Sequence, residues 1–130
     1  MLNSDDEIIF LSEIPVQGKV LYQAIAQSLA SQLSNYEIYF TKTKKPRDCR
    51  ISVITKSGKH EVVAWFWWQK RKQVFKVLLK LDKHNFYELY LNSLNDSKDQ
   101  CCKSECIIMN KDDAINVVNA IIFSSEKFLI

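Results

Sequence analysis

The stretch HEVVAWFWWQKRKQVFKVLL, residues 60–79, carries all three tryptophans of the chain and a polar, basic break at residues 69–72. Aromatic and β-branched side chains on both sides of the break are typical of strands. The stretch therefore predicts two strands, 60–68 and 73–81, joined by a hairpin loop at 69–72. Because side chains alternate between the faces of a strand, the register of this hairpin decides which tryptophans belong to a core.

A second hairpin precedes the first. CRISVIT, residues 49–55, alternates apolar and polar side chains, and Ser57 with Gly58 fits a two-residue turn. These two turns set Trp65 opposite Arg50 on one side and Lys76 on the other, a cation–π row worth roughly 0.5–1 kcal/mol per exposed contact. Although the hairpins are assigned separately, they predict one shared apolar face: Cys49, Ile51, Val53, Val62, Ala64, Phe66, Trp68, Phe75, Val77 and Leu79.

The opposite face of these strands mixes charged and aromatic side chains. We expect helices to cover the apolar face and bury Phe66 and Trp68, whereas Trp65 and Trp67 lie on the face without helices. Two alternatives remain: the C-terminal helix or segment 84–94 covers the second face, or a loop of odd length reverses the assignment. The predicted second face consists of Arg50, Ser52, Ile54, Glu61, Val63, Trp65, Trp67, Lys76, Leu78 and Lys80.

Two helices and a strand are predicted before the hairpins. A serine followed by three acidic residues favours a short helix over residues 4–13, because acidic side chains suit a helix N-terminus. Residues 18–33 carry apolar side chains at every fourth position, which indicates an amphipathic helix with one buried stripe. YEIYFT, residues 36–41, then alternates as a strand does.

The C-terminal third closes the predicted fold. Residues 84–94 fit a strand or a helix, and we favour the strand. ECIIM, residues 105–109, predicts a short buried strand, and Asn110 caps a final amphipathic helix whose first turn carries Asp112 and Asp113. The sequence thus predicts an α+β fold: an antiparallel sheet of about five strands with N-terminal and C-terminal helices packed on one face.

The size and composition of the chain indicate a single domain spanning residues 1–130. Hydrophobic residues make up 47% and charged residues 25%, which are ordinary globular values. No apolar run reaches the roughly 18 residues that a membrane span needs. The acidic N-terminus lacks the basic start of a signal peptide. We therefore expect a cytoplasmic protein, whose four cysteines stay reduced.

Charge is distributed unevenly along the chain. The formal net charge is +3, yet residues 42–83 hold 13 Lys and Arg against 3 Asp and Glu. Such a segment predicts a basic patch that attracts phosphate or an acidic protein. The alternative is a solvated sheet edge on which lysines prevent unwanted strand pairing.

No catalytic signature accompanies these features. CCKSEC lacks the paired spacing of a zinc site, and His60 and His84 lie near no recognisable nucleophile motif. There is no glycine-rich phosphate loop. Among the cysteines, we expect Cys49 and Cys106 to be buried, and Cys101 and Cys102 to be exposed. We therefore expect no enzyme activity, no cofactor and no metal.

The pattern of residues 36–41, the lysine-rich loop, the hairpins and ECIIMNKDDAINVVNAII at residues 105–122 resembles a known group of domains. These are small uncharacterised domains described as predicted transport proteins, which also occur beside restriction-type nucleases. The resemblance covers residues 18–125 and implies an accessory or binding domain without catalytic residues. The chain departs from the pattern by having NDSKDQCCKSE where a glycine-rich turn is expected, and no site residue is carried over.

The sequence therefore predicts a non-enzymatic binding module. Its partner is predicted to be nucleic acid, or an acidic or nucleic-acid-handling protein. We expect no binding to a membrane. The alternative is a small protein-binding inhibitor or adaptor, of the kind encoded by phages or mobile elements, which uses the same aromatic surface or self-associates through it as a homodimer. The predicted platform is Arg50, Trp65, Trp67, Lys76 and Lys80, with a basic rim of Lys44, Lys45, Arg47, Lys70, Arg71 and Lys72.

Overall fold

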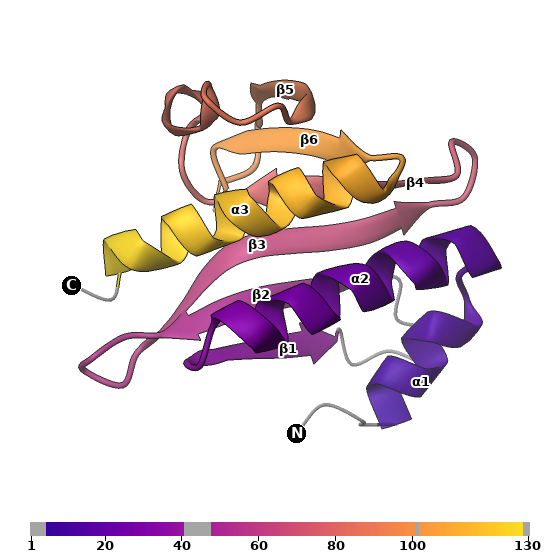
Figure 1. Cartoon of the computed structure of the whole chain (residues 1–130), viewed down its shortest axis with the longest axis horizontal. Coiled ribbons are helices and arrows are strands. Elements are labelled where there is room, and N and C mark those ends of the chain that lie inside the picture. Colours follow the sequence, from indigo (N-terminus) through magenta and orange to yellow (C-terminus); the bar gives the residue numbers. More distant parts are fainter. Residues whose placement is uncertain (1–4, 41–47, 101, 129–130) are drawn as a thin grey trace.

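A computed structural model describes residues 5–40, 48–100 and 102–128. It contains a six-stranded antiparallel sheet of order β1-β2-β3-β4-β6-β5, with the helices on one face (Figure 1). The α+β prediction is confirmed, with six strands rather than about five. The strands are β1 (Tyr36–Phe40), β2 (Asp48–Ile54), β3 (His60–Gln69), β4 (Val74–Leu79), β5 (Asn92–Asp96) and β6 (Ser104–Ile108). The helices are α1 (Asp5–Ser12), α2 (Val16–Gln32), α3 (Lys111–Phe128) and the short 3₁₀ helix η1 (Lys83–Phe86).

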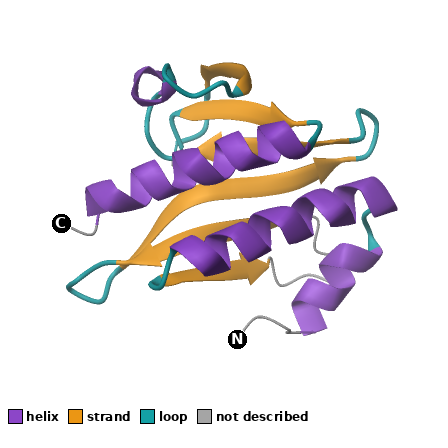
Figure 2. Ribbon diagram, viewed as in Figure 1, coloured by secondary structure: helices purple, strands orange, loops and turns teal. Residues whose placement is uncertain are grey.

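Helices α2 and α3 lie side by side across the sheet (Figure 2). Both are amphipathic, and their apolar stripes form the main core with the strand residues that point towards them. Helix α1 joins this core through Phe10, whose ring lies 5.5 Å from Tyr22 of α2 and 5.2 Å from Phe40 of β1. The helix layer therefore covers one face of the sheet.

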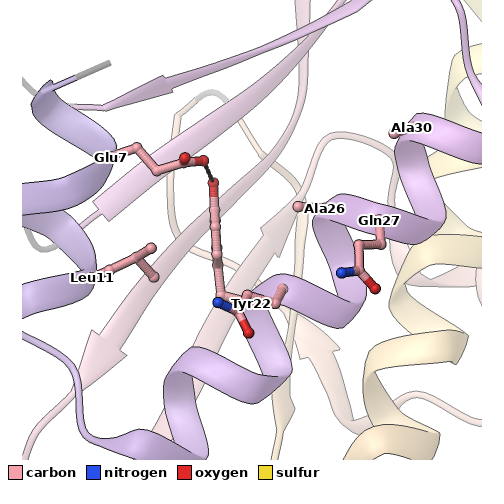
Figure 3. Close-up of a pocket in the computed structure, with 7 residues that line it drawn as sticks. Glu7, Leu11, Tyr22, Ala26, Gln27 and Ala30 are labelled. Atoms are coloured by element: carbon pink, nitrogen blue, oxygen red, sulfur yellow. Dashed lines mark hydrogen bonds between the residues drawn. The ribbon is translucent and has the colours of Figure 1, made fainter. Parts of the chain in front are cut away.

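An open hollow of about 410 Å³ lies between α1 and α2 (Figure 3). At its wall the Tyr22 hydroxyl donates a hydrogen bond to Glu7 Oε2 at 2.7 Å. Burial, followed by this hydrogen bond, raises the pKa of Tyr22 above its ordinary range. The phenol therefore stays protonated, and the bond links α1 to α2.

Helix α2 approaches the sheet closely at Gly18. A Cβ atom at this position would overlap the side chain of Ile14 and lie 3.1 Å from the Trp68 ring. Trp68 is only 5% exposed, as predicted for a core tryptophan. A residue without a side chain is thus needed where α2 begins to cross β3.

The hairpin between β2 and β3 differs from the predicted two-residue turn. Thr55 N donates to Lys59 O, which leaves a loop of three residues, and Gly58 adopts the left-handed conformation with φ of 85°. Next to the loop, the pairing of β2 with β3 is therefore shifted by one residue from the predicted register. A β-bulge at Val63 restores it, since the partners of Ser52 and Ile51 are Val62 and Ala64.

The bulge exchanges the environments of two neighbouring valines. Val63, predicted on the second face, is fully buried in the main core. Val62, predicted in the core, is half-buried and lies outside the main core cluster. Beyond the bulge the predicted alternation holds, because the odd loop and the extra residue cancel.

The hairpin between β3 and β4 also differs from the prediction by its register. Gln69 pairs with Val74, so the loop spans residues 70–73, and Gln73 takes a left-handed φ of 56°. The pairing shifts by two residues: Trp65 faces Leu78 instead of Lys76, and Trp67 faces Lys76. Because a shift of two residues keeps every side chain on the same face of the sheet, each β4 side chain lies on the face that was predicted for it.

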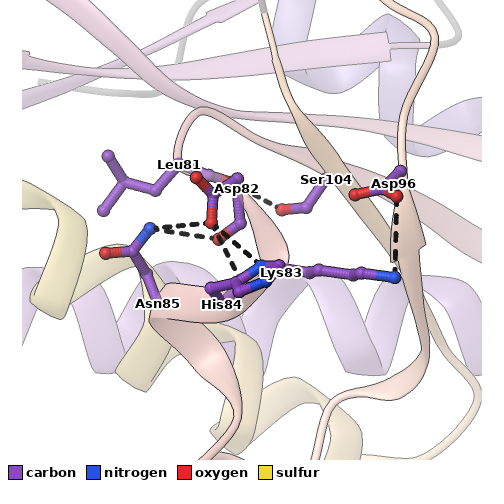
Figure 4. A network of polar contacts seen from close by, with 7 residues as sticks. All are labelled: Leu81, Asp82, Lys83, His84, Asn85, Asp96 and Ser104. Carbon is purple, nitrogen blue, oxygen red and sulfur yellow. Dashed lines mark hydrogen bonds and ion pairs between the residues drawn. The ribbon is translucent and has the colours of Figure 1, made fainter.

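Segment 84–94, predicted as a strand, is mainly not one. Asp82 accepts a hydrogen bond from His84 N at 3.0 Å and starts η1, and only the last three residues enter β5 (Figure 4). Phe86 at the end of η1 is fully buried and packs edge-on against Phe123 of α3. The part of the segment around Phe86 therefore lies beside α3 on the helix side of the sheet.

A candidate binding face on the open side of the sheet

The side of the sheet away from the helices presents two rows of aligned side chains. Strand pairing aligns the first row as Tyr39, Arg50, Trp65, Leu78 and Glu105. It aligns the second row as Asp48, Trp67, Lys76 and Ile107. We call these nine residues the tryptophan face.

None of the three α-helices in the described part of the chain packs on the tryptophan face. Trp65 and Trp67 are half-buried, with ring centroids 5.7 Å apart and planes inclined at 58°. Leu78 is only 3% exposed although it lies outside the main core cluster. The two indoles and their neighbours thus form a small apolar cluster of their own on the open side of the sheet.

Trp65 is held by one contact at the edge of its ring and another over its face. Its Nε1–H donates to Oδ2 of Asp48 at 2.8 Å, and the guanidinium of Arg50 lies 5.3 Å from its ring centroid. Both partners come from β2, so the cross-strand register fixes this arrangement. The predicted cation–π contact between Arg50 and Trp65 is therefore present, whereas the predicted position of Lys76 opposite Trp65 is wrong.

The charges of the tryptophan face balance one another. Lys76 Nζ lies 3.5 Å from Glu105 Oε2, and both side chains are about one-third exposed. The cations of the face, Arg50 and Lys76, are matched by the carboxylates Asp48 and Glu105. The face is consequently aromatic and neutral, not basic.

Lys80 does not join the tryptophan face, contrary to the prediction. Its ammonium forms an ion pair with Glu61 Oε2 at 2.9 Å and lies 5.6 Å from the ring centroid of Phe128 in α3. Strand β4 ends at Leu79, so the alternation of the strand no longer directs the next side chain. Lys80 therefore reaches towards the helix layer.

The predicted basic rim is only partly within the described structure. Lys44, Lys45 and Arg47 lie outside the described residues. The other three, Lys70, Arg71 and Lys72, are exposed on the loop between β3 and β4.

The basic loop borders a shallow depression lined in part by Trp68. The indole Nε1 of Trp68 is buried and has no hydrogen-bond partner among the described residues. The loop is connected to the start of α2 by a hydrogen bond of 3.0 Å from Gln17 Nε2 to Gln73 Oε1. The basic loop thus lies beyond the ends of the strands, separate from the two rows of the tryptophan face.

Two of the four cysteine predictions are confirmed. Cys49 and Cys106 are buried, and burial raises the pKa of the Cys106 thiol to about 12. Cys102 was expected to be exposed, but it is fully buried. Its backbone N–H donates to Asp99 Oδ1 at 3.1 Å where the chain turns towards β6. Cys101 lies outside the described residues.

Within the described ranges, no three His, Cys, Asp or Glu side chains gather closely enough to hold a metal ion. Nor does any helix there have the length and apolar character to cross a membrane. Comparisons with protein-family models, curated proteins and solved structures find no match to this chain. The resemblance to predicted transport protein domains therefore stays a prediction.

Proposed function

We propose that the chain is a non-enzymatic binding module whose partner docks on the tryptophan face. The observation that supports this proposal is the pair of half-buried indoles on a sheet face that no described helix covers. Trp, Tyr and Arg are the residues that most often dominate binding energy at protein interfaces. All three types occur in the two rows, with Tyr39 38% exposed at one end.

A protein partner fits this face better than nucleic acid does. Binding to a phosphate backbone requires several cations that are free to replace counterions, but the two cations of the tryptophan face are matched by two carboxylates, and Lys76 is already paired with Glu105. Stacking of bases requires accessible aromatic faces, and one face of Trp65 is already occupied by the guanidinium. The proposed role is therefore that of an adaptor or inhibitor that contacts another protein.

Nucleic acid is the second candidate partner, at a different place. Three consecutive exposed basic side chains, Lys70, Arg71 and Lys72, lie on the loop beyond the end of β3. Contacts of this kind weaken steeply and log-linearly with salt concentration, whereas an aromatic protein contact depends much less on salt. Salt dependence therefore distinguishes the two candidates.

The test compares capture of partners from lysate by three proteins. The wild type is compared with Trp65→Ala/Trp67→Ala and with the matched control Tyr87→Ala/Tyr90→Ala, whose aromatics are 63% and 88% exposed away from the tryptophan face. We expect the first variant to fold and lose the partner, and the control to keep it, with or without nuclease. Equal capture by both variants, or capture that nuclease abolishes, would contradict the proposal.

A further inference from the structure

We propose that the partner of the tryptophan face is a second copy of this chain. This inference rests on the proposed function and identifies the protein that docks. It is carried by the order of charges along the first row of the face, where a cation on β2 and a carboxylate on β6 stand on opposite sides of the central strands.

Two identical faces can pack together only if the pattern on each is complementary to itself under a two-fold rotation. Consider a two-fold axis that lies between the two packed faces, parallel to the strands and midway between β3 and β4. Rotation about this axis sets β3 of one copy over β4 of the other and β2 over β6, while each row stays opposite the same row of the second copy. Arg50 of one copy then lies opposite Glu105 of the other, and the contact occurs twice. The same rotation sets Trp65 against Leu78 of the second copy.

The second row is compatible with the same axis. Trp67 falls opposite Lys76 of the second copy, a favourable pairing of an indole with an ammonium. Asp48 falls opposite Ile107, but its carboxylate keeps the hydrogen bond from Trp65 and is not left without a partner. Glu105, already paired with Lys76, gains Arg50 as a second cation.

The size of the face predicts a dimer that dissociates readily. Strands about 4.8 Å apart and a rise of about 3.3 Å per residue give a six-stranded face, five residues long, a plan area on the order of 500 Å². A standard interface buries about 800 Å² per partner. We therefore expect reversible association in the micromolar range.

Sedimentation velocity of the full chain over a concentration series tests the proposal. We expect the wild type to shift from monomer to dimer, and Arg50→Glu or Glu105→Arg alone to weaken association roughly tenfold or more, because like charges then face each other. The double swap Arg50→Glu/Glu105→Arg should restore the dimer. Circular dichroism checks that each variant folds.

A second double swap, Arg50→Glu/Asp48→Arg, tests an axis perpendicular to the strands, which would set Arg50 against Asp48 of the second copy. If this double swap restores the dimer, self-association through the tryptophan face is supported, and the two-fold axis is perpendicular to the strands instead of parallel to them. A wild type that is monomeric at about 0.5 mM, well above the range expected for such an interface, overturns the inference. So does a dimer that neither Arg50→Glu nor Trp65→Ala/Trp67→Ala weakens.

The outcomes also separate this inference from the proposed function. One outcome is a monomeric wild type that still captures a protein which the Trp65→Ala/Trp67→Ala variant does not capture. This result contradicts a second copy as the partner but supports the tryptophan face as a binding site. A monomeric wild type that captures no protein through the tryptophan face contradicts both. A dimer sensitive to Arg50→Glu supports both.

Discussion

Trp65 donates its indole N–H to Asp48 at 2.8 Å, although the residue directly opposite Asp48 in the sheet is Trp67. The hydrogen bond therefore runs diagonally between β2 and β3. This hydrogen bond inclines the Trp65 ring towards Trp67. The guanidinium of Arg50, which like Asp48 belongs to β2, lies over the Trp65 ring. Asp48 is thus the residue that orients the centre of the tryptophan face.

Replacing Asp48 tests this role. We expect Asp48→Ala to lower the free energy of unfolding by about 1.5 kcal/mol, since a hydrogen bond to a charged acceptor contributes roughly 1.5–3 kcal/mol and this one is only part-buried. Urea denaturation measures the loss, and tryptophan fluorescence reports the changed indole environment. The control is Glu88→Ala, an exposed acid that should stay within about 0.5 kcal/mol of the wild type. Equal stability of the two variants would show that the diagonal bond contributes nothing.

Gly18 provides a test of the contact between α2 and β3. In an exposed helix, Gly→Ala stabilises by up to about 1 kcal/mol. Here we expect Gly18→Ala to destabilise the protein, because the new methyl group overlaps Ile14 and presses on Trp68. Gln23→Ala, at an exposed position of the same helix, should be neutral or slightly stabilising. Thermal unfolding of both variants decides the sign, and a raised melting temperature for Gly18→Ala would refute the close approach.

The alternation of residues 60–79 was enough to predict which tryptophan is core and which two lie on the second face. It succeeded for Trp65 and Trp67 although both hairpins differ from the predicted turns. The odd loop before β3 is cancelled by the bulge at Val63, and the loop after β3 shifts the register by an even number. Face assignment depends only on whether the shift is odd or even, so it survived errors that changed the individual pairs.

The remaining differences have local causes that periodicity does not reveal. The apolar positions of residues 84–94 fit a strand, but the carboxylate of Asp82 and the burial of Phe86 against α3 favour a 3₁₀ turn instead. The basic patch predicted from residues 42–83 ignored the carboxylate of Glu105, which follows far later in the chain and pairs with Lys76. Charge counted along a sequence misses partners that only the sheet brings together.

The bulge makes a direct prediction for the two valines beside it. Val63 is fully buried and Val62 is half-buried, so we expect Val63→Ala to cost about 2 kcal/mol and Val62→Ala less than about 1 kcal/mol. The two substitutions remove the same atoms from adjacent positions, so each controls for the other. Urea denaturation gives both values. The regular register predicted from the sequence requires the reverse order.

The buried thiols predict how stability depends on pH. Burial, then the charges of Asp113 and Glu105, raise the pKa of Cys106 from 9.0 to about 12, and burial raises the pKa of Cys49 as well. Above about pH 9 the unfolded thiols ionise while the folded thiols keep their protons, so the unfolded state binds fewer protons. The stability from this source is therefore complete below pH 9 and is lost as the pH rises towards 12.

Urea denaturation between about pH 8 and 10 measures this loss, which cannot exceed about 1.4 kcal/mol per pH unit for each thiol. Tyr22, whose pKa is also raised, adds a loss of the same sign only near and above its ordinary value of 10.0. Cys106→Ala should be less stable than the wild type at pH 7, because it leaves a small cavity. Its stability should nevertheless fall less steeply between pH 8 and 10, since one of the buried thiols is gone. An unchanged slope in this variant, or rapid reaction of Cys106 with a thiol reagent in the folded protein at pH 8, would show that Cys106 is not shielded as its burial indicates.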